Sequence, residues 1–216
     1  MSSVQQFAAQ AVRDTLGRST DVDACVALAA RLDDLLGEAA RHLQEGGAAL
    51  ACRAGCNFCC HLRVMVRPHE AIALFRHLQA RIPAVTAGRI RERLREYAAA
   101  KPVPRRPCAF LVDGECAAYA VRPGACAAYH SLSRERCEES FQDPSRPSGT
   151  VALQALREVA LALESGVDAA LQAEGLSDER LELHVAVAAL LGNPSLIARW
   201  RSGRTLRRPG PEPKES

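Results

Sequence analysis

A short stretch from Cys52 to His61 contains four of the nine cysteines of this 216-residue chain. It reads CRAGCNFCCH, so four thiols and one imidazole lie within ten residues. Cysteines that serve only as small buried hydrophobic residues have no reason to cluster so densely, whereas thiolate and imidazole are the ligands that proteins use for soft metal ions. The stretch therefore predicts a metal site, and the rest of the fold has to be arranged around it.

A second group of cysteines follows between residues 108 and 137. Its members are separated by seven, nine and ten residues, and they are Cys108, Cys116, Cys126 and Cys137. We expect this group to supply the remaining ligands, because a structural zinc ion takes four. The ninth cysteine, Cys25, falls on the apolar face of a predicted helix, and we interpret it as a core residue.

The spacing within the first group limits which thiols can share one ion. Cys56 and Cys59 are separated by two residues, the usual spacing by which one tight turn presents two sulfurs to a metal. Cys59 and Cys60 are adjacent, and successive side chains point to opposite sides of an extended backbone. We therefore expect one of this pair to face a second metal or to remain a free thiol.

A β-hairpin is predicted between Pro107 and Tyr119, with its turn at Asp113-Gly114. A two-residue loop would pair Val112 with Glu115 and place Cys108 and Cys116 on opposite faces. A three-residue loop with a bulge at Gly114 would place them on one face. If Cys108 and Cys116 bind one ion, the sequence predicts the bulged form, and a plain two-residue turn would refute such sharing.

Histidines and arginines near the cysteines are further candidates. His61 and His130 are possible alternative ligands, and His130 is the better one because it is predicted one helical turn after Cys126. A tetrathiolate zinc centre carries two negative charges, which nearby guanidinium groups could offset through hydrogen bonds to sulfur. The arginines that flank the cysteines, and that could equally be solvated surface residues, are Arg53, Arg63, Arg105, Arg106 and Arg122.

Composition and charge restrict the class of protein. Hydrophobic residues make up 48% of the chain and aromatic residues only 4%, which favours packed helices over a β-sandwich. Residues 197–216 carry six basic and two acidic side chains, a net charge of +4, which leaves −1 for residues 1–196. Global charge therefore gives no reason to predict a specific nucleic-acid partner. The sequence identifies no protein partner either.

The compartment is predicted from the N-terminus and from the apolar runs. No basic segment followed by an apolar run opens the chain, and no apolar stretch is long enough for a membrane span. We expect a cytoplasmic protein without a membrane partner, in which thiols stay reduced. Nine cysteines in reducing surroundings indicate metal ligands rather than disulfides.

The predicted fold is a single, mainly α-helical domain over residues 1–203, with a small β-hairpin and a cysteine-rich metal-binding centre in residues 50–140. The basic segment 204–216 is expected to be disordered. Residues 62–66 alternate like a strand, 101–107 form a proline-rich linker, and 133–149 are expected to be irregular apart from a turn at Cys137. Helices are predicted over 3–17, from 21 or 23 to about 45, over 69–81, 86–99, 150–165 and 178–191 (the last capped by Ser177), with short ones after Pro123 and around Leu196–Trp200.

The combined pattern over residues 50–140 resembles the YkgJ-type cysteine-cluster proteins. It consists of C-x3-C-x2-C-C from Cys52, Glu70 opening a helix, PCAFL from Pro107, DG-x-C ending at Cys116, Tyr119, and RP-x-x-C from Arg122. These proteins are described as zinc- or iron-chelating domains, and the flagellin lysine N-methylases carry a similar cluster. One departure is Ala127, since many members have arginine directly after the cysteine of the last motif.

The resemblance implies a set of metal ligands: Cys52, Cys56, Cys59, Cys60, Cys108, Cys116 and Cys126, with Cys137 and His130 less certain. Arg122 and Tyr119, which belong to the same motifs, are expected beside these ligands rather than on the metal. The resemblance implies zinc or iron as the bound metal. It does not decide whether the chain is an enzyme.

Three hypotheses about function follow. The first is a metal-binding protein, with zinc favoured over iron, whose thiolates stabilise the middle of a helical domain. The second is an iron–sulfur protein, possibly an enzyme related to the flagellin methylases, because such clusters use the same thiolate ligands. The spacing from Cys52 to Cys59 also occurs in radical S-adenosylmethionine enzymes, but the strand–helix alternation of their barrel is missing. The third is a disulfide-stapled scaffold, which needs an oxidising compartment.

Overall fold

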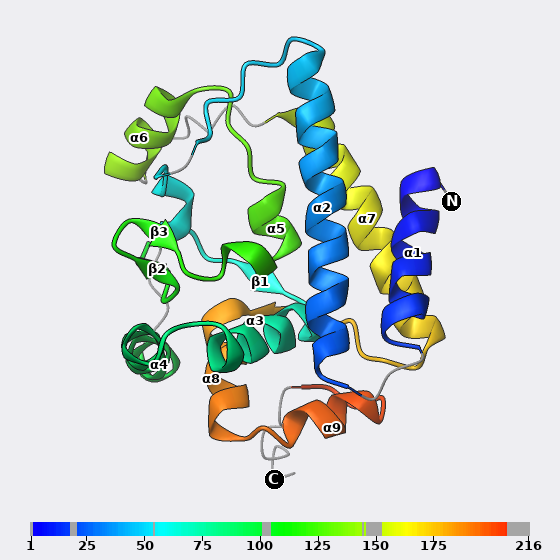
Figure 1. Cartoon of the computed structure of the whole chain (residues 1–216). Helices are drawn as coiled ribbons and strands as arrows, with labels where there is room; N and C mark the ends of the chain where they lie inside the picture. The colour runs from blue at the N-terminus through cyan, green and yellow to red at the C-terminus, as the bar shows by residue number, and fades with distance from the viewer. Residues whose placement is uncertain are drawn as a thin grey trace, which may run out of the picture.

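The computed structural model describes residues 2–17, 21–53, 55–100, 105–143, 145 and 153–206 (Figure 1). These parts of the chain are mainly helical, as predicted, with two small antiparallel sheets. The α-helices are α1 (Ser3–Thr15), α2 (Asp23–Glu45), α3 (Pro68–Ala80), α4 (Ala84–Ala99), α5 (Gly124–Ala127), α6 (Arg134–Gln142), α7 (Gln154–Ala173), α8 (Leu183–Gly192) and α9 (Leu196–Arg201). The strands are β1 (Met65–Val66), β2 (Leu111–Val112), β3 (Glu115–Cys116) and β4 (Leu181–Glu182), and the short 3-10 helices are η1 (Phe58–His61) and η2 (Tyr119–Val121).

Helices α1, α2 and α7 pack together on one side of the molecule (Figure 1). Helix α1 begins with a capping box, in which the Ser2 side chain accepts from the Gln5 amide and the Gln5 side chain accepts from the Ser2 amide. Gly166 of α7 faces this helix so closely that an added Cβ would lie 2.9 Å from the Ala8 Cβ. Only glycine permits this close approach, so the packing of α1 on α7 depends on it.

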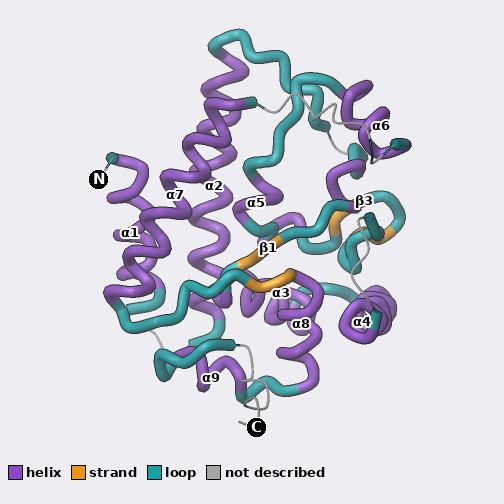
Figure 2. Tube along the Cα trace, turned by 180° about the vertical axis from the view of Figure 1, so that it is seen from behind, coloured by secondary structure: helices purple, strands orange, loops and turns teal. Residues whose placement is uncertain are grey.

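The pairing of β1 with β4 joins the chain after the cysteine stretch to the start of α8 (Figure 2). Val66 pairs with Leu181, and the amide of Leu183 donates to the Val64 carbonyl at 3.0 Å. The prediction of a helix over 178–191 capped by Ser177 was therefore wrong at its start. Residues before Leu183 are extended in this sheet, and the Glu182 side chain caps α8 by accepting from the Val185 amide at 2.9 Å.

Two other predictions of local structure are corrected. Residues 133–149 were expected to be irregular, but the Ser133 side chain accepts from the Arg136 amide and opens α6. The first turn of α6 also carries Glu135, which suits the positive end of a helix. The helix after Pro123 is only four residues long and ends before His130, so Cys126 and His130 do not share a helical face.

A single connected core contains residues from all the long helices, and Trp200 of α9 is fully buried in it. Its indole nitrogen donates to the Ser177 carbonyl at 2.9 Å. Leu206 is also buried, whereas residues 207–216 of the predicted basic tail and residues 101–104 of the predicted linker lie outside the described residues.

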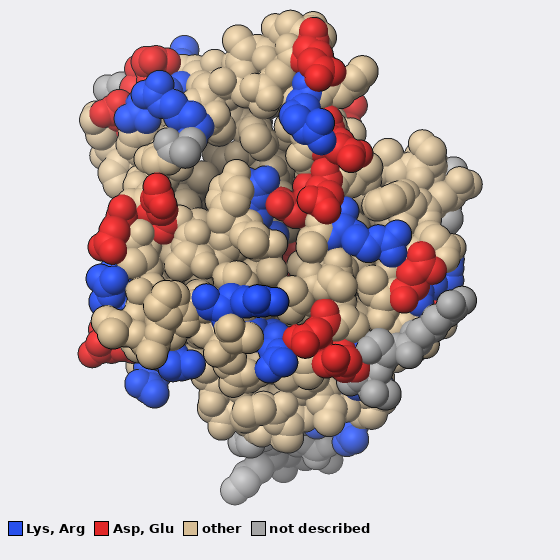
Figure 3. Space-filling view, in the orientation of Figure 1, with Lys and Arg blue, Asp and Glu red and all other residues tan. Residues whose placement is uncertain are grey.

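Acidic and basic side chains are interspersed on the face shown in Figure 3, in keeping with the small net charge of residues 1–196. Over the described ranges, the helices lack the combination of length and apolar character that a bilayer span requires.

Candidate metal centre

The predicted docking of the second cysteine segment on the first is confirmed. The amide of Cys108 donates to the Cys60 carbonyl at 2.7 Å, and the amide of Arg106 donates to the His61 carbonyl at 3.2 Å. Next to these bonds, the Asn57 side chain donates to the Gly114 carbonyl in the hairpin turn at 3.1 Å. The cysteine stretch and the hairpin therefore lie side by side, as Figure 1 also shows.

The other end of the cysteine stretch is held by the chain that precedes α6. The amide of Ala51 donates to the Ser131 carbonyl at 2.8 Å, and the amide of Ser131 donates to the Cys52 sulfur at 3.2 Å. Phe141 of α6 packs its ring against Phe58, with 5.6 Å between the ring centroids. These contacts bring α6, which carries Cys137, against η1.

Cys59 and Cys60 do not point apart as predicted. That prediction assumed extended backbone, whereas both residues lie in the 3-10 helix η1, where successive side chains are about 120° apart. The Cys60 thiol, together with burial, raises the pKa of Cys59. The adjacent thiols are therefore neighbours in space as well as in sequence.

The first neighbourhood of thiols consists of Cys52, Cys56, Cys59 and Cys137. Burial raises the pKa of Cys52, the Ser131 amide opposes this effect, and the other three thiols raise the pKa further. The four thiols are therefore electrostatic neighbours. We call these four residues the first thiol group.

A second neighbourhood surrounds Cys126. Burial raises the pKa of Cys126, and the thiols of Cys108, Cys59 and Cys116 raise it further. Burial also raises the pKa of Cys108, to about 12, and Cys116 contributes to this rise. We call Cys108, Cys116 and Cys126 the second thiol group; Cys59, which raises the pKa of Cys126 as well as that of Cys52, joins it to the first group.

The hairpin that carries Cys116 has a plain two-residue turn. Val112 pairs with Glu115, and both turn residues have positive φ, 51° at Asp113 and 85° at Gly114, as in a type I′ turn. The prediction of the bulged form was therefore wrong, and with it the argument that Cys108 and Cys116 share a face of the hairpin.

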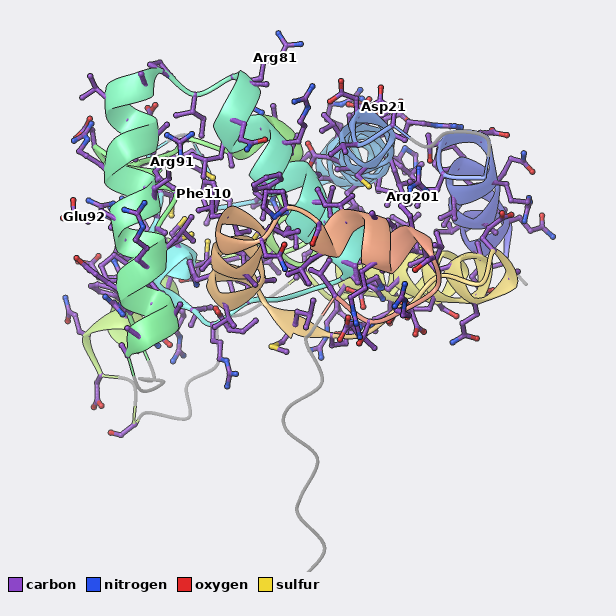
Figure 4. The ribbon with its side chains drawn as sticks, turned by 90° about the horizontal axis from the view of Figure 1, so that it is seen from below. Asp21, Arg81, Arg91, Glu92, Phe110 and Arg201 are labelled. Carbon is purple, nitrogen blue, oxygen red and sulfur yellow. The ribbon has the colours of Figure 1, made fainter. Side chains whose placement is uncertain are left out.

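Cys108 does not lie in the first strand of the hairpin, although the sequence argument assumed that it did. The amide of Leu111 donates to the Cys108 carbonyl at 2.9 Å, so Cys108 lies in a turn and not in the strand. Phe110, which is 1% exposed, points into the interior beside α4 and anchors this turn (Figure 4). The alternation of side chains along a strand therefore does not predict the direction of the Cys108 side chain. The turn, and not the strand, brings Cys108 near Cys116.

Glu70 positions the segment that carries Cys126. One carboxylate oxygen accepts from the Arg67 amide at 2.7 Å, at the start of α3, and the other accepts from the Gly124 amide at 2.8 Å, at the start of α5. Glu70 is only 8% exposed, so it links the two helix starts inside the protein. Cys126 lies two residues beyond Gly124.

The residues expected beside the ligands are partly in place. Arg122 forms an ion pair with Asp33 at 2.7 Å and lies over the Tyr119 ring. Burial raises the pKa of Cys116, and the charge of Arg122 opposes part of this rise. Tyr119 is largely exposed and faces Arg122. Arg105 and Arg106 bind the Ser140 hydroxyl and the Glu96 carboxylate respectively.

The side chains of His61 and His130, the two histidines considered from the sequence, form no described contact with a thiol of the second group. The Nδ1 atom of His61 lies 3.2 Å from the Asn57 carbonyl, and its ring packs edge-on against Phe141. The Nδ1 atom of His130 is buried, and none of the described residues forms a hydrogen bond with it.

Sequence reasoning missed His184, which contacts a predicted ligand directly. Its Nε2 atom lies 3.3 Å from the Cys108 sulfur, and its Nδ1 atom lies 2.7 Å from a Glu182 carboxylate oxygen. The Tyr97 ring stacks on the imidazole, with 4.0 Å between the centroids. A glutamate two residues before a histidine is too common a pattern to single out this site from the sequence.

The described thiols lie near one another but do not form a complete set of metal ligands. All nine cysteines are free thiols, and among the residues that the structure describes no three His, Cys, Asp or Glu side chains are arranged so as to hold a metal ion. Cys25, with 1% exposure, lies in the core as predicted.

Comparison with known proteins does not add to this description. No family model, curated protein or solved structure matches the chain.

Proposed function

We propose that the protein binds a metal ion through thiolates drawn from both cysteine segments. The observation that supports this proposal best is the docking of the second cysteine segment on the first, through the hydrogen bond from the Cys108 amide to the Cys60 carbonyl, since these two segments contain eight of the nine cysteines. Four thiolates are the ligand number of a structural zinc site. Binding would draw the thiol groups inward, because metal sites are rarely preformed without the metal.

Burial makes a bound cation the natural partner of these thiols. It raises the pKa of Cys52, Cys108, Cys116 and Cys126, so that the neutral thiols are favoured at neutral pH. A divalent metal reverses this preference, since it binds the thiolate and displaces the proton. Closely spaced, buried thiols without a metal would contribute little that alanine could not.

Zinc is the metal we propose first. It suits closed sets of four thiolates, and its binding stabilises small folds by about 10–16 kcal/mol in zinc-finger peptides. The described parts of 50–62 and the segment 105–137 form short elements that a few backbone hydrogen bonds join, so a metal would strengthen their attachment to each other. We place such a protein in a reducing compartment, the cytoplasm.

An iron–sulfur cluster is the second candidate. It uses the same thiolates, and Cys59, which is coupled to thiols of both groups, could help to place their sulfurs around one cluster. The resemblance of residues 50–140 to the YkgJ-type proteins and the flagellin methylases supports either metal. We propose no substrate, because the described residues show no arrangement that identifies a reaction.

Elemental analysis of protein purified without oxygen, together with its visible spectrum, tests this proposal. About two zinc ions per chain and no colour would support two thiolate sites. Iron, labile sulfide and absorbance near about 400 nm would favour the cluster instead. Protein that is fully folded, contains neither metal and does not take up added zinc would refute metal binding.

A further inference from the structure

We infer that His184, held by Glu182, is a nitrogen ligand of the metal that binds at Cys108. This inference rests on the proposed function, but it replaces one of the four thiolates of that site with a ligand from a part of the chain that the cysteine motifs do not include. His184 follows β4 at the start of α8, 76 residues after Cys108 in the sequence. The pairing of β1 with β4 brings the two residues together.

The distance between the two candidate ligand atoms fits one ion. A tetrahedral zinc ion with a Zn–N distance near 2.0–2.1 Å and a Zn–S distance near 2.3 Å places the two atoms about 3.6 Å apart. The Nε2 atom of His184 and the Sγ atom of Cys108 are 3.3 Å apart. A shift of a few tenths of an ångström would therefore let both atoms bind the same zinc ion.

Hydrogen bonds give His184 the tautomer that a ligand needs. Its Nε2 atom accepts from the Ala109 amide at 3.2 Å, so this nitrogen carries the lone pair and Nδ1 carries the proton donated to Glu182. A carboxylate that binds the distal nitrogen is the usual partner of a metal-ligating histidine. An ion at Nε2 would take the place of the Ala109 hydrogen bond.

The surroundings hold this arrangement in place. Glu182 uses its second oxygen to accept from the Val185 amide at 2.9 Å, so its carboxylate is fixed at the start of α8. Tyr97 stacks on the imidazole with an interplanar angle of 18°, and its hydroxyl donates to the Pro107 carbonyl next to Cys108. His184 itself is 3% exposed. The imidazole is therefore preoriented toward the Cys108 sulfur.

A cavity gives access to the proposed ligand. It has a volume of about 110 Å³ and lies beside Tyr97, Arg106, Glu182 and His184. Such a volume holds several water molecules. A metal ion at His184 would consequently be within reach of small solutes, unlike an ion enclosed by four buried thiolates.

X-ray absorption at the zinc edge of the full-length protein, loaded with zinc alone, tests the inference. We expect a mixed shell of sulfur and nitrogen with the outer scattering of an imidazole ring, and we expect the nitrogen signal to disappear in His184→Gln. The matched control is His77→Gln, because His77 is also partly buried but its Nε2 atom contacts the Ala117 carbonyl at 3.2 Å. Glu182→Gln should keep the nitrogen shell and weaken zinc binding about 10- to 100-fold, measured by competition with a chelator.

The possible failures are distinguishable. Bound zinc with sulfur ligands alone, or a nitrogen shell that survives in a folded His184→Gln protein, overturns the role of His184 and leaves the proposed function intact. Folded wild-type protein that binds no zinc overturns both. If His184→Gln does not fold, replacement of His61 and His130 one at a time decides the matter. The nitrogen shell should survive both replacements, and its loss in either would assign the ligand elsewhere.

Discussion

The amide of Cys108 donates a 2.7 Å hydrogen bond to the carbonyl oxygen of Cys60. This bond joins two cysteines that are separated by helices α3 and α4 in the sequence. The same contact region brings the hairpin turn to Asn57 and the Cys108 sulfur to His184. The fold therefore places the two cysteine segments together through backbone and side-chain contacts.

Glu70→Gln should destabilise the protein, because a neutral amide cannot accept from both the Arg67 and the Gly124 amides. One of these amides would be left facing an NH₂ group at a site that is only 8% exposed. Loss of a buried hydrogen bond to a charged group costs about 1.5–3 kcal/mol. Urea denaturation measures the loss of unfolding free energy.

The matched control for this change is Glu92→Gln on the exposed surface of α4, where Glu92 points outward (Figure 4). This substitution should change the unfolding free energy by less than about 0.5 kcal/mol. Equal stability of the two variants would mean that Glu70 does not link α3 to α5 as described.

Gly166→Ala should destabilise the packing of α1 on α7. The added Cβ would lie 2.9 Å from the Ala8 Cβ and 2.9 Å from the Gln5 Cα, so α1 would have to move. Overpacking of this kind costs about 1–3 kcal/mol. We expect a lower midpoint of thermal unfolding.

Gly88→Ala in α4 is the opposite case, since among the described residues no atom outside the adjacent backbone of α4 lies within 4 Å of the added Cβ. Alanine favours a helix over glycine by up to about 1 kcal/mol, so this variant should be more stable than the wild type. If Gly166→Ala stabilised the protein to the same extent, the described close approach of α1 to α7 would be contradicted.

The stability of the protein should fall as the pH falls below about 6.5, because His69 is buried in its neutral form. Burial, with the nearby charge of Arg67, lowers the pKa of His69 from 6.5 to about 3. The unfolded chain then binds the proton that the folded chain excludes, so stability is complete above pH 6.5 and declines toward pH 3. Between pH 7 and pH 5 the loss is about 2 kcal/mol.

Urea denaturation at pH 7 and pH 5 checks this effect against His69→Leu. The variant lacks the titrating group, so its decline with pH should be smaller by that same amount, whatever its absolute stability. An identical decline in both proteins would show that His69 does not exclude the proton.

The helical class, the position of the hairpin and the docking of the two cysteine segments could be predicted from the sequence. Periodic apolar residues fix the long helices, and Cys25 falls on such a stripe and lies in the core. The docking could be anticipated because thiols so densely placed require partners, and the second segment holds four of the five other cysteines.

Other features depended on contacts that the sequence does not display. Cys59 and Cys60 were expected to point apart because extended backbone was assumed, but the chain forms a 3-10 turn there. Helix α6 was missed because its polar surface shows little periodicity, although Ser133 is a recognisable cap. His184 was missed because β1 and β4 pair over a long sequence separation, and no local sequence pattern predicts that pairing.

The central claim is that the second thiol group binds a metal together with the cysteine stretch. The metal content of wild-type, Cys126→Ser and Cys25→Ala proteins, purified without oxygen, tests it most directly. We expect about two zinc ions per wild-type chain, about one in Cys126→Ser and no loss in Cys25→Ala. Unchanged metal content in a folded Cys126→Ser protein, or no metal in the wild type, would contradict the claim.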